Sequence, residues 1–438
     1  TPIGLASSWD TNLAKDIAEY TADEMRATGY HWTFSPNVEI VRDARWGRIG
    51  ESFGEDPFLI TQLGIAMLKG YQGDNLDENS KVLACAKHLV AGGIAYNGLN
   101  AAPADVSERT LREIFFPPFV ELIKEGVFSI MPAHNELNGV PCHSNKWLLD
   151  DVLRNEWGFE GAVISDWTDV EKLYSVHKVA STRKEADKIS VLAGLDMHMH
   201  GPLFLDNIEE AVLEGKIKES RIDQSVKRIL KAKFALGLFE NKLVDESKLE
   251  QVLLQEKHLK LALTAAEKSI VLLKNKNQIL PLDIRENSTI FITGPNANDQ
   301  SILGDWSKIQ PDENVITVKE GIENILEKSD KVTYYNCGEI HDISDESIDN
   351  AYLKAEKSDY TIVAVGENSI RENEHRTSGE NLDRANLDLA GNQLKLLKKI
   401  KESGTKLIII YINGSPISSP WCQENADAII EAWEPGMM

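Results

Sequence analysis

Residues 161–167, GAVISDW, decide the fold expected for the first half of the chain. An apolar run from Ala162 to Ile164 is followed directly by Ser165, Asp166 and Trp167. A carboxylate at the end of a buried strand costs free energy unless it has a partner or a function there. The stretch therefore predicts a buried strand whose carboxyl end carries Asp166. A simpler interpretation is a strand-end Asp that caps the next helix, which SDWTDVEKL also allows.

The same form recurs along residues 1–239, because apolar runs that end in polar groups alternate with helical patterns. The runs are KVLACAKHLV (81–90), VFSIMPAHN (127–135) and ISVLAGLDMHMH (189–200). Residues 10–29 read as an amphipathic helix, with Asp10 at its N-cap and Gly29 just past its end. Strands that alternate with helices predict a parallel sheet. Polar groups at the strand ends are typical of a (β/α)8 TIM-type barrel.

Fewer than eight strands are visible, so the N-terminal part of the barrel is expected to be missing. The polar stretch 240–258 is expected to be an interdomain linker, and residues 259–275 read as one helix. Strand and helix patterns then alternate again, with apolar strands such as TKLIIIYING (405–414). Residues 259–438 are therefore expected to form an α/β sandwich domain with a mostly parallel sheet, cut short at its C-terminus.

Composition limits the classes of function. The chain has 438 residues, 42% of them hydrophobic and 26% charged, which is typical of a globular protein with two or three domains. A formal charge of −22 repels phosphates and argues against nucleic acid or an anionic membrane as partner. The sequence has no apolar stretch of about 18 residues, so it predicts no membrane-spanning helix. The four cysteines lack CxxC spacing, which argues against a zinc site or a disulfide framework.

If the strands share one barrel, their polar ends meet at one mouth. An ionised carboxylate there suits a nucleophile that attacks a carbon with developing positive charge. Indole and imidazole faces suit the C–H face of a sugar ring, and basic groups suit its hydroxyls. The residues at the strand ends are Asp43, Arg45, Trp46, Arg48, Lys87, His88, Met131, His134, Asp166 and Trp167.

An ordered series of motifs resembles glycoside hydrolase family 3, the β-glucosidase and β-xylosidase family. The series includes RWGRIGESFGEDP (45–57), KH (87–88), NGVP (138–141), LRNEWGFEGAVISDW (153–167) and SGENLDR (378–384). Each piece is weak alone, but their order is specific, and the resemblance covers nearly the whole chain.

The resemblance implies roles for individual residues. Asp166 would be the catalytic nucleophile, and Arg48, Lys87 and His88 would bind the sugar of the −1 subsite. Trp167, Met131 and His134 would line the substrate site. Many relatives have Tyr or Phe where this chain has His134, so the shape of the sugar wall is expected to differ.

The acid/base residue is expected on a loop of the second domain that is rich in Glu. The family's S-G-E motif corresponds to Glu380. Some relatives carry the acid soon after the preceding strand, which would correspond to Glu372. The competing interpretation of the loop is a solvated run of charge.

Other classes of function compete with this one. His198-x-His200 could belong to a metal-dependent barrel hydrolase, since two imidazoles on one strand face can bind zinc. ITGPNAND (292–299) lacks GxGxxG and is a weak dinucleotide signal. No His follows the Lys87–His88 pair on its loop, which argues against the β-N-acetylglucosaminidase branch. A truncated, non-catalytic sugar-binding protein is the remaining class.

The sequence thus predicts a retaining exo-acting β-glycosidase that releases terminal β-D-glucose through a covalent glycosyl-enzyme, with β-xylosidase as the alternative. The expected partner is a β-linked glucoside or oligosaccharide, without cofactor or metal. The resemblance is compatible with a homodimer and with a secreted or periplasmic location. The chain itself shows no signal region.

Overall fold

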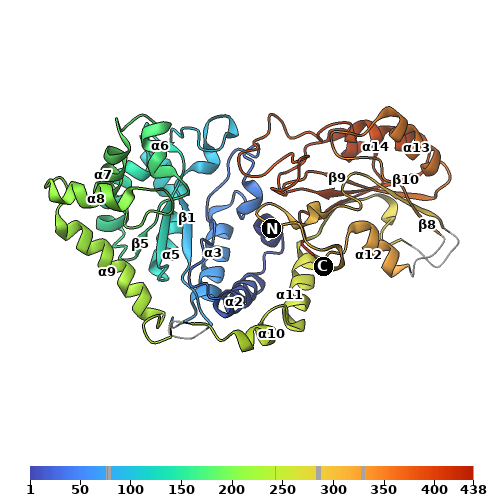
Figure 1. The fold of residues 1–438 in the computed structure, drawn as a ribbon. Coiled ribbons are helices and arrows are strands. Elements are labelled where there is room, and N and C mark those ends of the chain that lie inside the picture. Colours follow the sequence, from blue (N-terminus) through green and yellow to red (C-terminus); the bar gives the residue numbers. More distant parts are fainter. Residues whose placement is uncertain (75, 77–79, 242, 283–287, 327–330, 438) are drawn as a thin grey trace. The chain divides into compact units, whose positions relative to one another are not determined.

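The computed structural model describes residues 1–438 except 75, 77–79, 242, 283–287, 327–330 and 438 (Figure 1). It contains two compact units. The barrel unit comprises Asp10–Asp43 and Ser52–Leu261. The sandwich unit comprises Thr1–Trp9, Ala44–Glu51 and Ala262–Met438.

The barrel unit is built on parallel strands. Its sheet has the order β1 (Cys85–Leu89), β2 (Ser129–Pro132), β5 (Ala162–Val163). Single parallel bridges extend it, Trp32 to Leu83 on one side and Ile164 to Met197 on the other. The strand backbones are buried on both faces, which explains their continuous apolar sequence. A two-stranded hairpin follows β2, with strands β3 (Glu136–Leu137) and β4 (Val140–Pro141).

Helices surround these strands along the chain. They are α2 (Thr11–Ala27), α3 (Pro57–Gln72), α4 (Glu108–Thr110), α5 (Pro117–Lys124), α6 (Asp169–Ser175), α7 (Arg183–Ala193), α8 (Phe204–Leu213), α9 (Glu219–Ala235) and α10 (Leu249–Val252). The start of α2 follows the sequence prediction, because the Asp10 side chain accepts a hydrogen bond of 3.0 Å from the Leu13 N–H. Gly29 follows the helix at φ 87°, a conformation that favours glycine.

The sandwich unit contains a six-stranded sheet in the order β6-β11-β10-β9-β7-β8. Strands β7 to β11 pair in parallel, and only β6 is antiparallel, at one edge. The strands are β6 (Val271–Asn275), β7 (Ile290–Thr293), β8 (Val332–Tyr334), β9 (Tyr360–Gly366), β10 (Lys406–Ile412) and β11 (Ala428–Glu431). The prediction of a mostly parallel sheet is confirmed.

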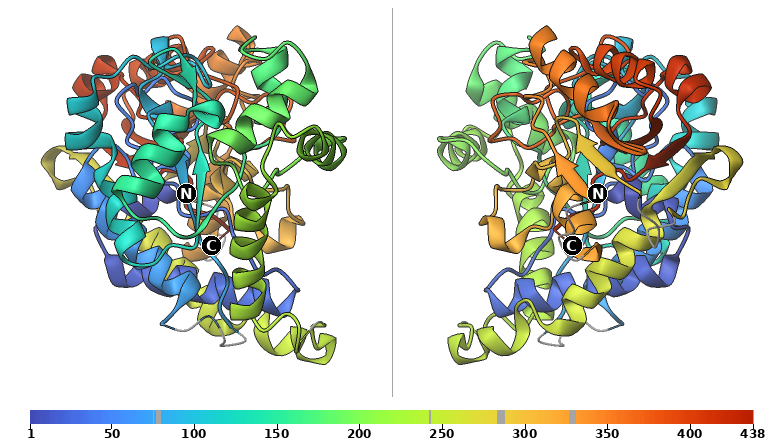
Figure 2. Two further views of the ribbon diagram at one scale, coloured as in Figure 1. Left: turned by 90° about the vertical axis from the view of Figure 1, so that its left-hand side faces the viewer. Right: turned by 90° about the vertical axis from the view of Figure 1, so that its right-hand side faces the viewer.

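Helices cover both faces of this sheet, as Figures 1 and 2 show. Side chains alternate along β9: Val363 and Val365 pack in the core with α13 and α14, whereas Ile362 and Ala364 pack in the core with α12. The helices of the unit are α1 (Pro2–Ser7), α12 (Val318–Ile325), α13 (Asp345–Ala355), α14 (Gln393–Glu402) and α15 (Pro420–Asn425).

Four features differ from the sequence expectations. Helix α7 covers Arg183–Ala193, so the first part of the apolar run 189–200 is helical and not a strand. Residues 44–51, which contain RWGR, belong to the sandwich unit, and so do residues 1–9. The expected linker 240–258 lies within the barrel unit and contains α10. The helix expected over 259–275 is wrong in its second half. Helix α11 (Glu256–Ser269) ends there, and the apolar VLLKN forms β6 against β11.

Helix length and hydropathy bear on membrane insertion. Across the part of the chain that the structure describes, no helix has both the length and the apolar character that a membrane crossing requires.

Candidate active site

Asp166 follows β5, and hydrogen bonds fix both its backbone and its side chain. Its backbone N–H donates to His143 Nε2 at 3.0 Å, and its Oδ1 accepts from the Trp167 N–H at 2.6 Å. The N-cap position of α6 belongs to Thr168 at φ 58°, without a side-chain cap. Asp166 therefore does not serve as the N-cap of that helix. Its side chain keeps 13% exposure, so the carboxylate is reachable from solvent.

His88, at the end of β1, contacts the same carboxylate. Its Nε2 lies 3.3 Å from Asp166 Oδ2, and its Nδ1 lies 2.7 Å from Glu39 Oε2. Glu39 is buried and also accepts from the Gly92 N–H at 3.0 Å. The imidazole is thus fixed between a buried carboxylate and the candidate nucleophile.

His134 makes a second contact of this kind from the end of β2. Its Nε2 lies 3.1 Å from Asp166 Oδ2, and its Nδ1 lies 2.7 Å from Asp169 Oδ2. The rings of His88 and His134 stack with centroids 5.8 Å apart. Both imidazoles therefore contact Oδ2 of Asp166, whereas the Trp167 N–H donates to Oδ1.

Three other predicted residues lie on the same strand ends. Lys87 is half-buried and precedes His88 on β1. Met131 is 1% exposed and packs with Cys85 and Ile164 in the core, so it supports the strands from within. Trp167 is 56% exposed and stacks face to face on His200, with centroids 3.8 Å apart. An exposed indole of this kind offers a flat apolar surface to a ligand.

Glu380 lies in the sandwich unit, where two arginines hold its carboxylate. Arg48 Nη1 is 3.2 Å from Glu380 Oε1, and Arg371 Nη2 is 2.5 Å from Glu380 Oε2. Arg48 also pairs with Glu51 through two hydrogen bonds of 2.7 and 2.9 Å. The Glu380 N–H donates to Asp305 at 2.8 Å, and burial raises the pKa of Asp305. Residues 44–51 belong to the sandwich unit, so Arg48 contacts Glu380 within that unit.

The RWGR and SGENLDR motifs contact each other directly. The Gly379 N–H donates to the Gly47 carbonyl at 3.1 Å, and the Gly47 N–H donates to Asp383 Oδ1 at 2.8 Å. A Cβ at Gly47 would lie 2.3 Å from the Gly379 carbonyl oxygen, closer than side chains come. Glycine is required there because the two backbones meet.

The other glutamates of the loop differ from Glu380. Glu372 is half exposed, and its pairing with Lys308 at 3.8 Å is loose. Glu367 is buried against Arg384; burial raises the pKa of Glu367, and the Arg384 charge partly opposes this rise. Among these three carboxylates, Glu380 alone is both partly accessible and held in a defined position by the contacts above.

The two histidines of the proposed metal pair point to different partners. His198 lies 3.5 Å from Glu171 and stacks on Phe204, whereas His200 stacks on Trp167. Within the described residues, the one group with the spacing of a metal site is His134, Asp166 and Asp169. A metal held by His198 and His200 therefore has no third ligand in this part of the chain.

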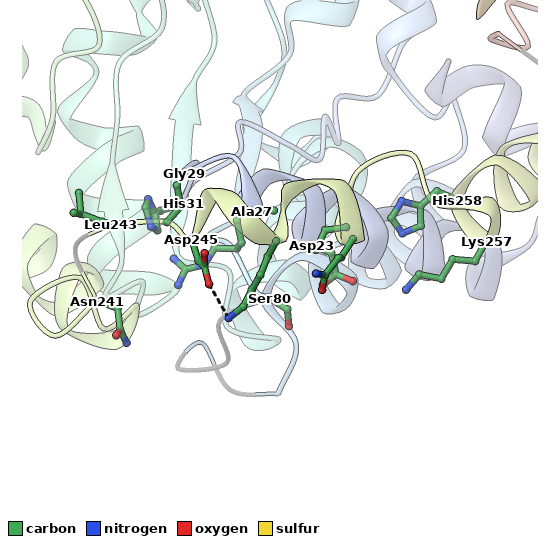
Figure 3. A pocket seen from close by; sticks show the side chains of 15 residues that line it. Asp23, Ala27, Gly29, His31, Ser80, Asn241, Leu243, Asp245, Lys257 and His258 are labelled. Carbon is green, nitrogen blue, oxygen red and sulfur yellow. Dashed lines mark ion pairs between the residues drawn. The ribbon is translucent and has the colours of Figure 1, made fainter.

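A wide pocket of about 680 Å³ lies elsewhere in the barrel unit, among α2, α10 and α11 (Figure 3). His31 and Ser80 line it and precede the parallel strands, so it lies at their N-terminal ends. Barrel enzymes place their chemistry at the opposite, C-terminal ends. None of the predicted site residues lines this pocket. Despite its size, it is not the candidate active site.

Sequence reasoning missed the residues that support the site. Glu39, Asp169 and His143 are buried behind His88, His134 and Asp166. Their motif signal is weak, because a buried polar residue looks like any strand-end or helix-start residue. Asp169 was visible only as the second Asp of SDWTD.

Family models match almost the whole chain. The N-terminal domain model of glycosyl hydrolase family 3 matches residues 1–232, and the C-terminal domain model of that family matches residues 270–438. The chain therefore belongs to glycoside hydrolase family 3. The predicted fold class, a (β/α) barrel domain followed by an α/β sandwich, is confirmed.

Named relatives include both sugar specificities. A β-xylosidase of Formosa agariphila is 38% identical over 99% of this chain and 62% of its own length. A periplasmic β-glucosidase of Salmonella typhimurium is 30% identical over 99% of this chain and 59% of its own length. A mutant β-glucosidase of Listeria innocua, solved with laminaribiose, superposes with a TM-score of 0.93 at 34% identity, covering 100% of this chain and 59% of that one. The chain thus spans about three fifths of these relatives.

The close approach at Gly47 gives a first prediction. Gly47→Ala should loosen the 371–384 loop, because the added Cβ pushes against backbone rather than a flexible side chain. Trypsin should then cut faster after Arg371, Arg376 and Arg384. Gly321→Ala is the matched control, since its Cβ would lie 3.8 Å from the nearest side chain. Equal cleavage rates in both variants would contradict the close packing of the two motifs.

The position of His143 gives a second prediction. Burial lowers the pKa of His143 from 6.5 to about 4, against the opposing charges of Asp169 and Asp166. Because Nε2 accepts the Asp166 N–H, the proton should sit on Nδ1. ¹⁵N spectra of histidine-labelled protein should show a neutral Nδ1–H ring that does not titrate between pH 7 and 5, with His143→Gln identifying the signal. Below pH 6.5 the His143 ring takes up a proton in the unfolded chain but not in the folded chain. This group should therefore lower the free energy of unfolding as pH falls from 6.5 toward 4. Titration near 6.5 would show that the ring is solvated.

Proposed function

We propose that this chain is the catalytic part of a retaining exo-acting β-glycosidase that releases terminal β-D-glucose from β-glucosides or oligosaccharides. The observation that carries the proposal is the Asp166 carboxylate, partly exposed at the end of β5 and contacted on one oxygen by two imidazoles. Family membership supports it, as do relatives named as β-glucosidases.

In the first step, an Asp166 carboxylate oxygen attacks the anomeric carbon of the terminal sugar. The bond from that carbon to the glycosidic oxygen breaks, and the leaving oxygen takes a proton from Glu380. The products are a glycosyl ester of Asp166, the released alcohol and an ionised Glu380. The transition state resembles an oxocarbenium ion, which the adjacent negative charge stabilises.

In the second step, Glu380 takes a proton from water while the water oxygen attacks the anomeric carbon. The ester bond breaks, Asp166 regains its charge, and the sugar leaves with retained configuration. Retaining enzymes hold the two carboxyl groups about 5–5.5 Å apart, so the working enzyme requires Glu380 at that distance from Asp166.

The remaining predicted residues have roles in binding sugar. Lys87 and His88 would donate to hydroxyls of the −1 sugar, and Trp167 would pack on its apolar face. Arg48, which contacts Glu380 in this structure, would turn to a sugar hydroxyl. Losing one positive neighbour would favour protonated Glu380, which is the form that a general acid needs.

A β-xylosidase of the same family is the second candidate. The 38% identity to a protein named β-xylosidase favours it. Glucose differs from xylose by its exocyclic CH₂OH group, so kcat/KM on paired 4-nitrophenyl β-glucoside and β-xyloside decides between them. The β-glucosidase assignment predicts the higher value on the glucoside, and the reverse order would replace it.

The same two glycosides, assayed with and without a chelator, distinguish a two-carboxylate glycosidase from a metal-dependent hydrolase and from a sugar-binding protein. A glycosidase that works through two carboxylates keeps its rate in chelator. A loss of rate that zinc restores would indicate a metal-dependent hydrolase. Sugar binding without hydrolysis of any glycoside would indicate a non-catalytic sugar-binding protein.

The nucleophile assignment predicts the behaviour of Asp166→Ala and Asp166→Asn. Both should lower kcat by several orders of magnitude, because the covalent step is lost. The circular dichroism spectrum should stay that of the wild type, since the side chain does not cap α6. A variant with more than about a tenth of the wild-type kcat would remove Asp166 from this role.

The acid/base assignment predicts a leaving-group effect. Glu380→Ala should spare the glycosylation step of a 2,4-dinitrophenyl glucoside more than that of cellobiose, because a weakly basic phenolate needs no proton. Azide should restore turnover and yield β-glucosyl azide, since a small anion replaces the activated water. Glu372→Ala, in the same loop, is the matched control and should behave as wild type. Azide rescue of Glu372→Ala alone would move the role to Glu372.

A further inference from the structure

The side chain of His134 lies between two carboxylates. Its Nε2 is 3.1 Å from Asp166 Oδ2, and its Nδ1 is 2.7 Å from Asp169 Oδ2. A neutral imidazole has one N–H and can donate to only one of two such acceptors. The imidazolium has two and can donate to both. The geometry is therefore that of a protonated ring that joins Asp169 to the candidate nucleophile.

Asp169 is a buried, ionised carboxylate and can therefore hold a protonated imidazole in place. It is 2% exposed, and its Oδ1 accepts a hydrogen bond of 2.7 Å from the Lys172 ammonium. Its Oδ2 also lies 3.4 Å from Nδ1 of His143. Burial alone would raise the pKa of Asp169, but the interactions with His134, His143 and Lys172 outweigh burial and lower the pKa well below its usual value. Asp169 thus stays ionised at any pH at which the enzyme would work.

Other titratable groups of the barrel unit surround His134 and Asp166. His88 approaches Asp166 Oδ2 from β1, with buried Glu39 behind it. Lys87 precedes His88 on the same strand, His143 contacts the Asp166 backbone, and Lys172 faces Asp169 from α6. His88 remains in place when His134 changes, so a change at His134 tests its own contribution.

We propose that His134 is a positioning residue for the glycosidase reaction: as an imidazolium anchored by Asp169, it orients Asp166 and keeps it ionised for attack. The inference rests on the proposed function. When Asp166 becomes an ester its charge is lost, and when water releases the sugar the charge returns to the carboxylate. A donor fixed at Oδ2 stabilises that returning charge, so His134 assists both steps through Asp166.

A divalent cation is the competing explanation for the same three side chains, because one ligand atom from each lies within 4.8 Å of the others. Two features oppose it. Both nitrogens of His134 already face carboxylate oxygens, and the Lys172 ammonium and the His88 ring add donors at those same carboxylates. Positive groups at the ligands weaken cation binding.

The kinetic test compares His134→Phe, His134→Gln and the wild type on a 2,4-dinitrophenyl β-glycoside of the preferred sugar. Phe removes both donors, whereas Gln keeps one neutral N–H donor. His134→Phe should lower kcat/KM about 10- to 100-fold, the range for one hydrogen bond to a charged group. The acidic limb of its pH profile should move to higher pH, because the carboxylate loses a positive neighbour. His134→Gln should recover part of the rate.

The matched control is His258→Phe. His258 is also a mostly buried imidazole on a carboxylate, 2.5 Å from Glu24, but it lies on α11 and packs against the Tyr20 ring. Its variant should keep both the rate and the pH profile. A fall in kcat/KM of His134→Phe that is the same at every pH would reduce His134 to a packing residue, and an unchanged rate would refute the proposal.

The role of Asp169 is tested by a double-mutant cycle. Asp169→Asn should lower kcat/KM in the wild type but add little in the His134→Phe background, because Asp169 acts through His134. Additive losses would contradict the coupling. If His134→Phe does not fold, His134→Gln and Asp169→Asn carry the test by the same shift of the acidic limb.

A readout that does not depend on turnover separates this inference from the proposed function. ¹⁵N spectra at pH 7 should show His134 with two bonded protons, and Asp169→Asn should convert it to a neutral ring. If these spectra are observed but the protein hydrolyses no glycoside, the proposed function is refuted and the charge arrangement stands. A neutral His134 in an active wild type would refute the inference alone. A loss of activity in chelator, restored by zinc, would show that a metal occupies the three groups.

Discussion

A negative charge held at the end of an apolar strand is the constraint on which the site depends. Taking a carboxylate out of water costs several kcal/mol unless donors replace the lost water. Around Asp166 these donors are the rings of His88 and His134 and the Trp167 N–H. Each ring is fixed in turn by a buried carboxylate, Glu39 or Asp169.

This arrangement separates two tasks that a nucleophile must combine. The contacts at Oδ2 hold the group in place, and the 13% exposure of the side chain leaves it reachable. A fully buried carboxylate would be protonated or inaccessible, and a fully solvated one would be poorly oriented.

The sandwich unit solves a related problem for Glu380. Two guanidinium groups and the Asp305 carboxylate fix the residue and its backbone. The RWGR motif takes part because Gly47 lets the two chain segments touch. Residues that are far apart in sequence, 45–48 and 378–384, thus form one structural element.

Part of this could be predicted from sequence because local pattern determines it. The apolar runs of β9 and β10 identify buried parallel strands, Asp10 and Gly29 mark the ends of α2, and Asp166 stands out as a charge after an apolar run. Motif resemblance identified the family and the predicted roles. Both the apolar pattern and the motifs consist of residues that are close together in the sequence.

Other features could not be predicted because they depend on distant residues. The VLLKN segment can be helical or extended, and pairing with β11 selects the strand. Arg48 pairs with Glu380, which lies far away in the sequence. The role of three further residues depends on the contacts that folding creates. These contacts join Glu39 to His88, Asp169 to His134 and His143 to Asp166.

In the proposed reaction, Asp166 forms a covalent bond with the sugar. The most direct test is inactivation by 2,4-dinitrophenyl 2-deoxy-2-fluoro-β-D-glucoside, or the xyloside if that sugar is preferred, followed by mass spectrometry of the intact protein and its peptides. Fluorine at C2 slows both steps, and the good leaving group lets the first proceed, so the ester accumulates. We expect one fluoroglycosyl group per chain, on the peptide that contains Asp166, and none in Asp166→Ala. A label on another carboxylate, or full activity after complete turnover of the reagent without any label, would contradict it.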